Sequence, residues 1–236
     1  MIDALTPSEL EAVRLSLKVA AVSVLASLPF GFALAWVLAR WRFPGKTLLD
    51  AIVHLPLVLP PVVMGYLLLV AFGRRGPVGA WLEETLGVVF AFRWTGAALA
   101  CALMGLPLLV RAIRQALESI DPRLESAAAT LGAGRAWVLA SVTVPLALPG
   151  IVNGMLLSFA RSLGEFGATI TFVSNIPGET QTLPLAIYGY TQVPGGDAQA
   201  MRLCVLSVLL SLAALVASEL LVRRAHHGLH GDAHRD

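Results

Sequence analysis

Arg161 and Glu165 are opposite charges placed inside one of the most apolar stretches of the chain, "FARSLGEFGATITFVSN" (residues 159–175). Twenty-five uncharged residues, 136–160, precede Arg161. Residues four apart lie on one face of a helix and can form an ion pair. A charge at the centre of a bilayer costs about 2.5–3.5 kcal/mol on insertion scales. The pair therefore either fixes a helix within a bundle or lines a translocation path, where the guanidinium could meet a passing anion.

Further residues of this stretch support a face turned away from lipid. Ser162 and Thr169 continue roughly the same polar face, and Gly164 and Gly167 are small residues that suit close helix packing. We therefore expect a translocation path or its gate to involve four residues: Arg161, Ser162, Glu165 and Thr169.

The composition indicates an integral membrane protein. Of 236 residues, 57% are hydrophobic and 14% are charged, whereas soluble domains carry roughly a quarter charged residues. The mean hydropathy is +0.77. The net charge of +2 gives no strong basic field for nucleic acid. We therefore expect membrane lipid to surround the chain and exclude nucleic acid as a partner.

Motifs for catalysis and cofactor binding are absent from the sequence. Cys101 and Cys204 both lie in apolar segments and are interpreted as small hydrophobic residues. The four histidines of the tail, at 226, 227, 230 and 234, are interpreted as part of a solvated terminus rather than a metal site, because no carboxylate or thiolate cluster has the spacing of metal ligands. No metal site and no cofactor are therefore expected. No phosphate-binding loop of the form GxxxxGK[ST] occurs either. The chain should therefore not hydrolyse ATP itself.

Five segments are long and apolar enough to cross a membrane, which takes about 20 residues each. They lie at about 15–39, 48–72, 95–112, 144–172 and 200–222. The fold class predicted is therefore an all-α membrane protein with five transmembrane helices. Three prolines, Pro56, Pro60 and Pro61, fall within the second span and are expected to kink it.

The distribution of Lys and Arg predicts the orientation. With the N-terminal residues 1–12 outside, ten of the seventeen basic residues face the cytoplasm. The tail 223–236 is then cytoplasmic as well. The ten are Arg40, Arg42, Lys46, Arg111, Arg114, Arg123, Arg135, Arg223, Arg224 and Arg235.

The longest internal polar segment, about 118–136, then also faces the cytoplasm. Asp121 can cap a helix that has Pro122 at its first position, and Gly132 and Gly134 are expected to end that helix. The alanines and glycines offer a smooth docking surface, and Pro145 should break the backbone into the next span. An ordinary helix on the membrane surface is the alternative interpretation.

This segment resembles the cytoplasmic signature of permease subunits of bacterial ATP-binding-cassette importers. The signature is Glu-Ala-Ala, three residues, Gly, nine residues, Ile, one residue and Leu-Pro. Here Ala127 and Ala128 precede Gly132 by that spacing, and Pro145 follows at the expected distance. The chain departs from the pattern at Ser126, where the signature has Glu, and Glu125 stands one residue earlier. The resemblance implies an ATPase-coupling helix with eight candidate residues: Glu125, Ser126, Ala127, Ala128, Leu131, Gly132, Gly134 and Pro145.

The resemblance extends over about residues 10–222. "FPGKTLLDAIVHLPLVLPPVVMGYLLLVAFGRRG", "LGAGRAW" and "FARSLGEFGATITFVSNIPGETQTLP" are similar to molybdate permeases of Gram-negative bacteria, and "ARSLGEFGA" is also similar to sulfate/thiosulfate permeases. The resemblance implies a type I importer permease fold in the bacterial inner membrane. It also implies a second copy of the chain, two ATPase subunits and a periplasmic molybdate-binding protein as partners. Molybdate, and tungstate with it, is the implied substrate.

Three other functions remain as alternatives to this interpretation. A sulfate/thiosulfate permease belongs to the same family. A secondary transporter driven by protons or sodium would need a path of carboxylates deep in the spans. A membrane enzyme or receptor component would have no transport role. Co-purification with an ATPase subunit would separate the last two from the importer.

Overall fold

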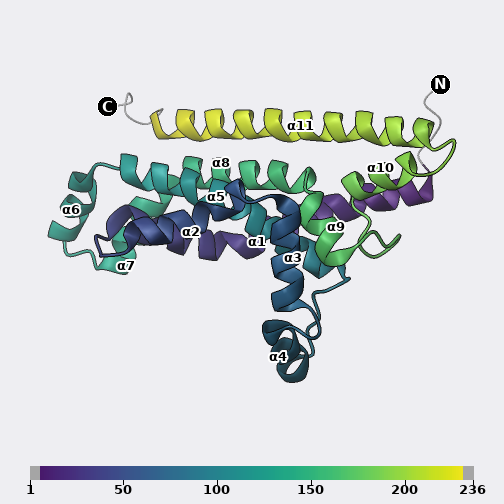
Figure 1. The fold of residues 1–236 in the computed structure, drawn as a ribbon. Helices are drawn as coiled ribbons and strands as arrows, with labels where there is room; N and C mark the ends of the chain where they lie inside the picture. The colour runs from purple at the N-terminus through teal and green to yellow at the C-terminus, as the bar shows by residue number, and fades with distance from the viewer. Residues whose placement is uncertain (1–5, 231–236) are drawn as a thin grey trace.

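The computed structural model describes residues 6–230, with the backbone alone for 218, 219 and 221–230. Every regular element in that part of the chain is a helix (Figure 1). Four helices are long and apolar enough to cross a membrane, or five if one bent pair counts as a single span. The predicted all-α membrane fold is thereby confirmed. The ends of the predicted N-terminal segment and tail, 1–5 and 231–236, lie outside the described residues.

Four long helices run lengthwise beside one another (Figure 1). They are α1 (Pro7–Arg40), α5 (Trp94–Ser119), α8 (Val144–Leu163) and α11 (Asp197–His230). α5 is the central helix, since it packs against both α1 and α8. In its most apolar stretch 61% of the residues are buried, against 11% in α11. The described part of α11, residues 197–217, therefore presents most of its apolar side chains to the surroundings of the chain.

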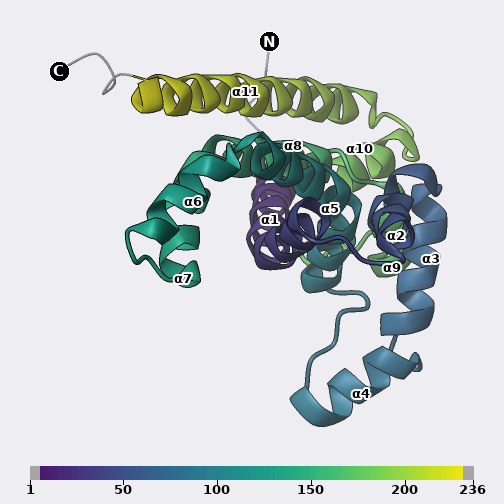
Figure 2. The same cartoon turned by 90° about the vertical axis from the view of Figure 1, so that its left-hand side faces the viewer.

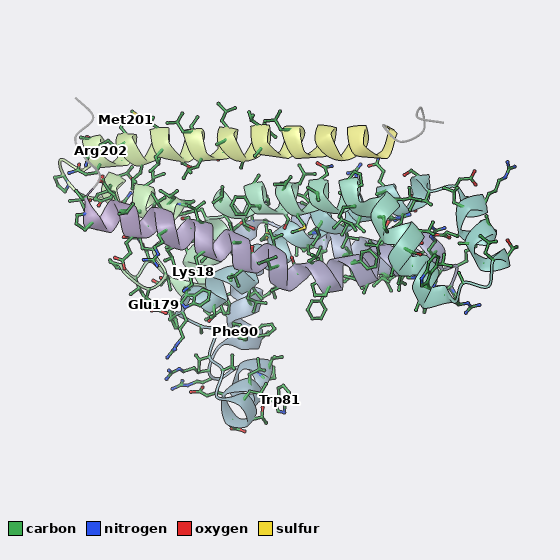
Figure 3. All side chains as sticks on the ribbon, turned by 180° about the vertical axis from the view of Figure 1, so that it is seen from behind. Lys18, Trp81, Phe90, Glu179, Met201 and Arg202 are labelled. Atoms are coloured by element: carbon green, nitrogen blue, oxygen red, sulfur yellow. The ribbon has the colours of Figure 1, made fainter. Side chains whose placement is uncertain are left out.

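α1 begins at a complete capping box. The Thr6 side chain accepts the backbone N–H of Glu9, and the Glu9 carboxylate accepts the N–H of Thr6 at 2.7 Å. The 34 residues of α1 extend about 51 Å at 1.5 Å per residue, which exceeds the roughly 30 Å of a bilayer core. Glu9 also contacts Arg202 of α11 at 2.9 Å, which joins the two helices at this end. Arg202 lies at the start of α11 (Figure 3).

The second predicted span consists of two helices rather than one kinked helix. α2 (Lys46–Val58) and α3 (Pro61–Phe72) meet at an angle of 113°. Leu59 is extended, as a residue before proline prefers to be, and Pro61 starts the next helix. Pro56 lies inside α2, which continues past it. Among the three prolines expected to kink the span, the adjacent pair therefore stands at the break.

α3 and the short helix α4 (Pro77–Leu86) form an arm that projects sideways from the bundle (Figures 1 and 2). Its exposed Trp81 lies at the far end of that arm (Figure 3). α3 is held to the bundle by α9 (Gly167–Val173). A Cβ added to Gly65 would lie 2.5 Å from the carbonyl oxygen of Ala168, so the two backbones touch.

The two ends of the bundle carry different short helices. α6 (Pro122–Thr130) and α7 (Arg135–Val138) lie at one end, together with the last turns of α11 (Figure 1). α9 and α10 (Leu183–Thr191) lie at the other end, near the start of α1. The start of α1 and the end of α11 are thus on opposite sides of the bundle.

The fourth predicted span differs from the structure in its outer part. α8 ends at Leu163 and α9 begins at Gly167, so residues 144–172 are not one helix. At its other end α8 continues α7 through one π-helical turn, η1 (Leu139–Thr143), which gives an apolar helical stretch of 29 residues. The break at 164–166 places Glu165 between two helices, where its carboxylate can act as a cap.

Candidate functional site

α6 begins as the sequence predicts. The Asp121 side chain accepts the N–H of Arg123 at 2.9 Å, and Pro122 occupies the first helical position. The helix ends at Thr130, and Gly132 then adopts the left-handed region with φ +87°. Gly134 has a different position from the one expected: it is the N-cap of α7 and so begins the next helix rather than ending α6.

The alanines and glycines of the importer-like signature lie together on one surface. A hollow of about 560 Å³ is lined by Ala127, Ala128, Leu131, Gly132, Ala133, Gly134, Trp137 and Val142. Leu131 is 88% exposed and Trp137 is 60% exposed. Two large apolar side chains thus flank a shallow floor of alanine and glycine. That combination suits a close-fitting protein partner, since small residues let a second backbone approach.

Glu125 holds this segment to two spans. Its Oε1 lies 2.7 Å from an amino nitrogen of Arg40, the last residue of α1, and accepts the Thr143 hydroxyl at 2.8 Å. The neighbouring Ser126 is exposed and donates only to the carbonyl of Pro122. The carboxylate of Glu125, which stands one residue before the Glu position of the motif, therefore connects α6 to residues of two other elements.

Pro145 does not break the helical backbone between α7 and α8. It occupies one of the first two positions of α8, directly after the π-helical turn η1. Proline has no N–H for the carbonyl four residues earlier, here that of Ser141, and π turns relieve such mismatches inside a helix. The expectation of a break at Pro145 was wrong, because α7, η1 and α8 are continuous.

Glu165 lies in the break between α8 and α9 rather than within one helix. Its side chain is 1% exposed, and its Oε2 lies 2.7 Å from a guanidinium nitrogen of Arg161. Its Oε1 accepts the N–H of Ala168 at 2.8 Å, inside the first turn of α9. The carboxylate therefore both neutralises Arg161 and caps α9. Arg161 itself is 28% exposed.

The other two residues expected at the path or gate are buried. Ser162 donates to the carbonyl of Ser158 at 2.8 Å and lies 3.1 Å from the hydroxyl of Ser23 on α1. Thr169 donates to the carbonyl of Phe166 at 2.9 Å. Both hydroxyls are turned into the bundle, so of the four residues Arg161 alone reaches the exposed side.

Sequence reasoning missed Arg40 and Thr143, the two partners of Glu125. Arg40 entered it only as one basic residue among ten, and Thr143 as an unspecified position of the motif. No local spacing could have joined Arg40 to Glu125, because they are 85 residues apart in the chain. The signal available was a basic residue at the end of the first predicted span and an acidic residue in the polar segment 118–136, both expected on the cytoplasmic side.

The fold is that of known importer permeases. The chain superimposes on a subunit in the "Crystal structure of bacterial alginate ABC transporter in complex with alginate pentasaccharide-bound periplasmic protein" with a TM-score of 0.72, over 93% of this chain and 80% of the other. The sequences are 18% identical, so this likeness concerns the fold. The fold is thus that of permease subunits of ATP-binding-cassette importers.

Sequence comparison gives the family. Residues 27–227 match the family described as binding-protein-dependent transport system inner membrane component. The chain is 61% identical over 219 residues to the molybdenum transport system permease protein ModB of Escherichia coli (strain K12), covering 93% of this chain and 96% of the relative. It is 39% identical to the sulfate transport system permease protein CysT of the same organism, over 86% and 74%. The chain belongs to this family and is an inner-membrane protein.

Proposed function

We propose that this chain is the membrane-spanning subunit of an ATP-driven importer of molybdate, and that it carries tungstate as well. The single observation that supports molybdate as the substrate is the 61% sequence identity to a molybdenum transport permease across nearly the whole chain. The sulfate permease is the second candidate, supported by a lower identity of 39%.

The coupling segment supports a separate ATPase as the energy source. Its exposed apolar floor, with Leu131 and Trp137 at the sides, has no covering element among the described residues. We propose that an ATPase subunit docks there in the cytoplasm, which places the N-terminus outside. Closure of two ATPases on ATP would then move α6 and α7 of two permease copies.

The internal links of the chain support a route for that motion. α7 leads into α8 through η1, and Glu125 joins α6 to α1 through Arg40. A displacement of the segment therefore shifts α1 and α8 together, and both pack on the central α5. We propose that this shift opens the path alternately to the cytoplasm and to a periplasmic molybdate-binding protein.

The proposal is tested by uptake of labelled molybdate into cells that lack their own molybdate permease. The cells receive this chain with its cognate ATPase and binding protein, and unlabelled tungstate or sulfate is added as competitor. Block by tungstate and little effect of equimolar sulfate is the expected result. Equal block by sulfate would move the chain to the sulfate/thiosulfate branch, and uptake without the ATPase would refute ATP-driven import.

A further inference from the structure

Arg111 and Arg114 stand in the same turn of α5 but differ in their charge environment. The Arg114 guanidinium lies 2.8 Å from Glu118 Oε1 and 3.1 Å from Asp50 Oδ1 of α2. For Arg111, no carboxylate oxygen of the described residues lies within 4.0 Å. Within the part of the chain that the structure describes, Arg114 is therefore neutralised and Arg111 keeps an unpaired positive charge.

Arg111 lies where two surface hollows adjoin. The hollow between α5 and α8 has a volume of about 540 Å³, and its polar lining includes Arg111, Gln115 and Asn153. The hollow between α2 and α5 has a volume of about 510 Å³ and is also lined by Arg111 and Gln115. Arg111 and Gln115 are exposed, and one helical turn separates them on the same face of α5.

The floor between α5 and α8 is closed by small residues. A Cβ on Gly150 would collide with Ala116, and one on Gly154 would lie 3.1 Å from the Cβ of Ala112. Backbones packed this closely leave no room for long side chains between them. Three polar groups therefore extend into the open side of the hollow: the guanidinium of Arg111 and the amides of Gln115 and Asn153.

Polar groups continue along α8 towards the opposite end of the bundle. Arg161 and Asn153 are eight residues apart, which is about 12 Å along a helix. Arg161 is partly exposed and Asn153 is half-buried. Arg111 lies eight residues before the end of α5, at the α6 side of the bundle. Arg161 is already paired with Glu165, so among these polar groups Arg111 is the cation without a carboxylate partner in the described residues. Lipid would oppose such a charge at the end of an apolar span unless water reaches it.

We propose that Arg111, with the amides of Gln115 and Asn153, is a low-affinity contact site for a tetrahedral oxyanion on the cytoplasmic side of the path. This inference rests on the proposed function. The planar guanidinium offers paired N–H donors that match two oxygens of such an anion, and the amides add neutral donors. Because the site is open to water, screening keeps the binding weak, which suits release.

The nearby carboxylates favour release over retention. Asp50 and Glu118 line the adjoining hollow and repel an anion that moves past Arg111, although Arg114 neutralises part of their charge. An anion leaving Arg111 thus meets no second free cation in that hollow, where the other arginine is already paired. The site would guide the anion out without trapping it.

A thiol placed beside Arg111 tests occupancy directly. In the assembled transporter with Cys101→Ala and Cys204→Ala, Leu108→Cys, which lines the same hollow one helical turn before Arg111, is labelled with a negatively charged thiosulfonate reagent. About 10 mM molybdate, compared with chloride at equal ionic strength, should slow the reaction at least threefold, and adding Arg111→Gln should abolish the slowing. Equal rates with and without molybdate, or the same slowing without Arg111, would overturn the proposal. Equal rates are also the result expected if a lipid phosphate occupies Arg111.

Uptake supplies the second measurement. Arg111→Gln should lower molybdate uptake at least fivefold at an equal amount of membrane complex, and Arg111→Lys should retain about half. The control is Arg42→Gln, which removes an exposed arginine that lines neither hollow. Wild-type uptake by Arg111→Gln would refute the contact site at Arg111 and leave the proposed import of molybdate untouched. If the unaltered chain takes up no molybdate, the proposed function fails, and slowing of the thiol reaction by sulfate would still support an oxyanion contact.

Discussion

Arg40, the last residue of α1, lies 2.7 Å from Glu125 of α6, and the same carboxylate oxygen accepts the hydroxyl of Thr143. One carboxylate thus joins the end of a long span, the short docking helix and the turn that leads into α8. The side chains of Arg40 and Glu125 are each 22% exposed, so water screens the pair only in part. If α6 docks an ATPase as proposed, a helix held at two points would transmit displacement instead of swinging freely.

Glu125→Ala should weaken the coupling of ATP hydrolysis to uptake without unfolding the chain. A charge-assisted link that is partly exposed is worth about 1 kcal/mol, which is about a fivefold effect. We expect basal ATPase activity of the complex to persist and molybdate uptake per ATP hydrolysed to fall by that factor. Glu84→Gln, an exposed glutamate on the distant arm, is the matched control. Unchanged uptake per ATP in Glu125→Ala would refute the coupling role of this link.

Ala127→Trp should block docking of the ATPase. Ala127 is exposed and lines the hollow between Leu131 and Trp137, so an indole there would fill the floor that a partner needs. We expect at least a tenfold loss of ATPase that co-purifies with the tagged chain, at an unchanged amount of chain in the membrane. Thr130→Trp places the same side chain on an exposed position of α6 outside this hollow and should lose less.

Much of the fold could be predicted from local sequence, because its rules are local. Runs of about 20 apolar residues give spans, and the Asp121–Pro122 pair gave the start of α6. Proline accounts for one error, the break expected at Pro145, and for a bend in the second span that is larger than the expected kink. A single proline, such as Pro145, was accommodated by a π turn, whereas the adjacent pair Pro60–Pro61 turned the chain by 113°. Which of these happens depends on packing partners that lie far away in the sequence.

The candidate site was harder to predict than the fold, because several of its contacts join residues that lie far apart in the sequence. The pairing of Arg161 with Glu165 could be predicted from their spacing, but not the break that gives Glu165 a second task as the cap of α9. Arg111 entered the sequence analysis as a marker of orientation only. Its distinction from Arg114 depends on Asp50, which is brought across from α2 by the tertiary fold.

The Arg161–Glu165 pair allows a double-variant test of its two possible roles. Arg161→Leu leaves the buried carboxylate of Glu165 without its partner, which is strongly destabilising in a buried pair, at about 3–5 kcal/mol; partial exposure of Arg161 reduces this. Adding Glu165→Gln removes that buried charge and should recover most of the thermal stability. If the pair is structural, uptake recovers with it. If Arg161 contacts the anion, uptake stays low in a stable protein.

Gly65→Ala should detach the arm from the bundle. A Cβ at this position would lie 2.5 Å from the carbonyl oxygen of Ala168 and 2.8 Å from the Cβ of Thr171, so α3 and α9 would have to separate. Overpacking of this kind costs about 1–3 kcal/mol, and each kcal/mol lowers Tm by about 2–4 °C in a chain of this size. The matched control is Gly164→Ala, where φ is −95° and nothing lies within 4 Å of an added Cβ. Equal melting temperatures of the two purified variants would show that the contact of α3 with α9 does not hold the arm.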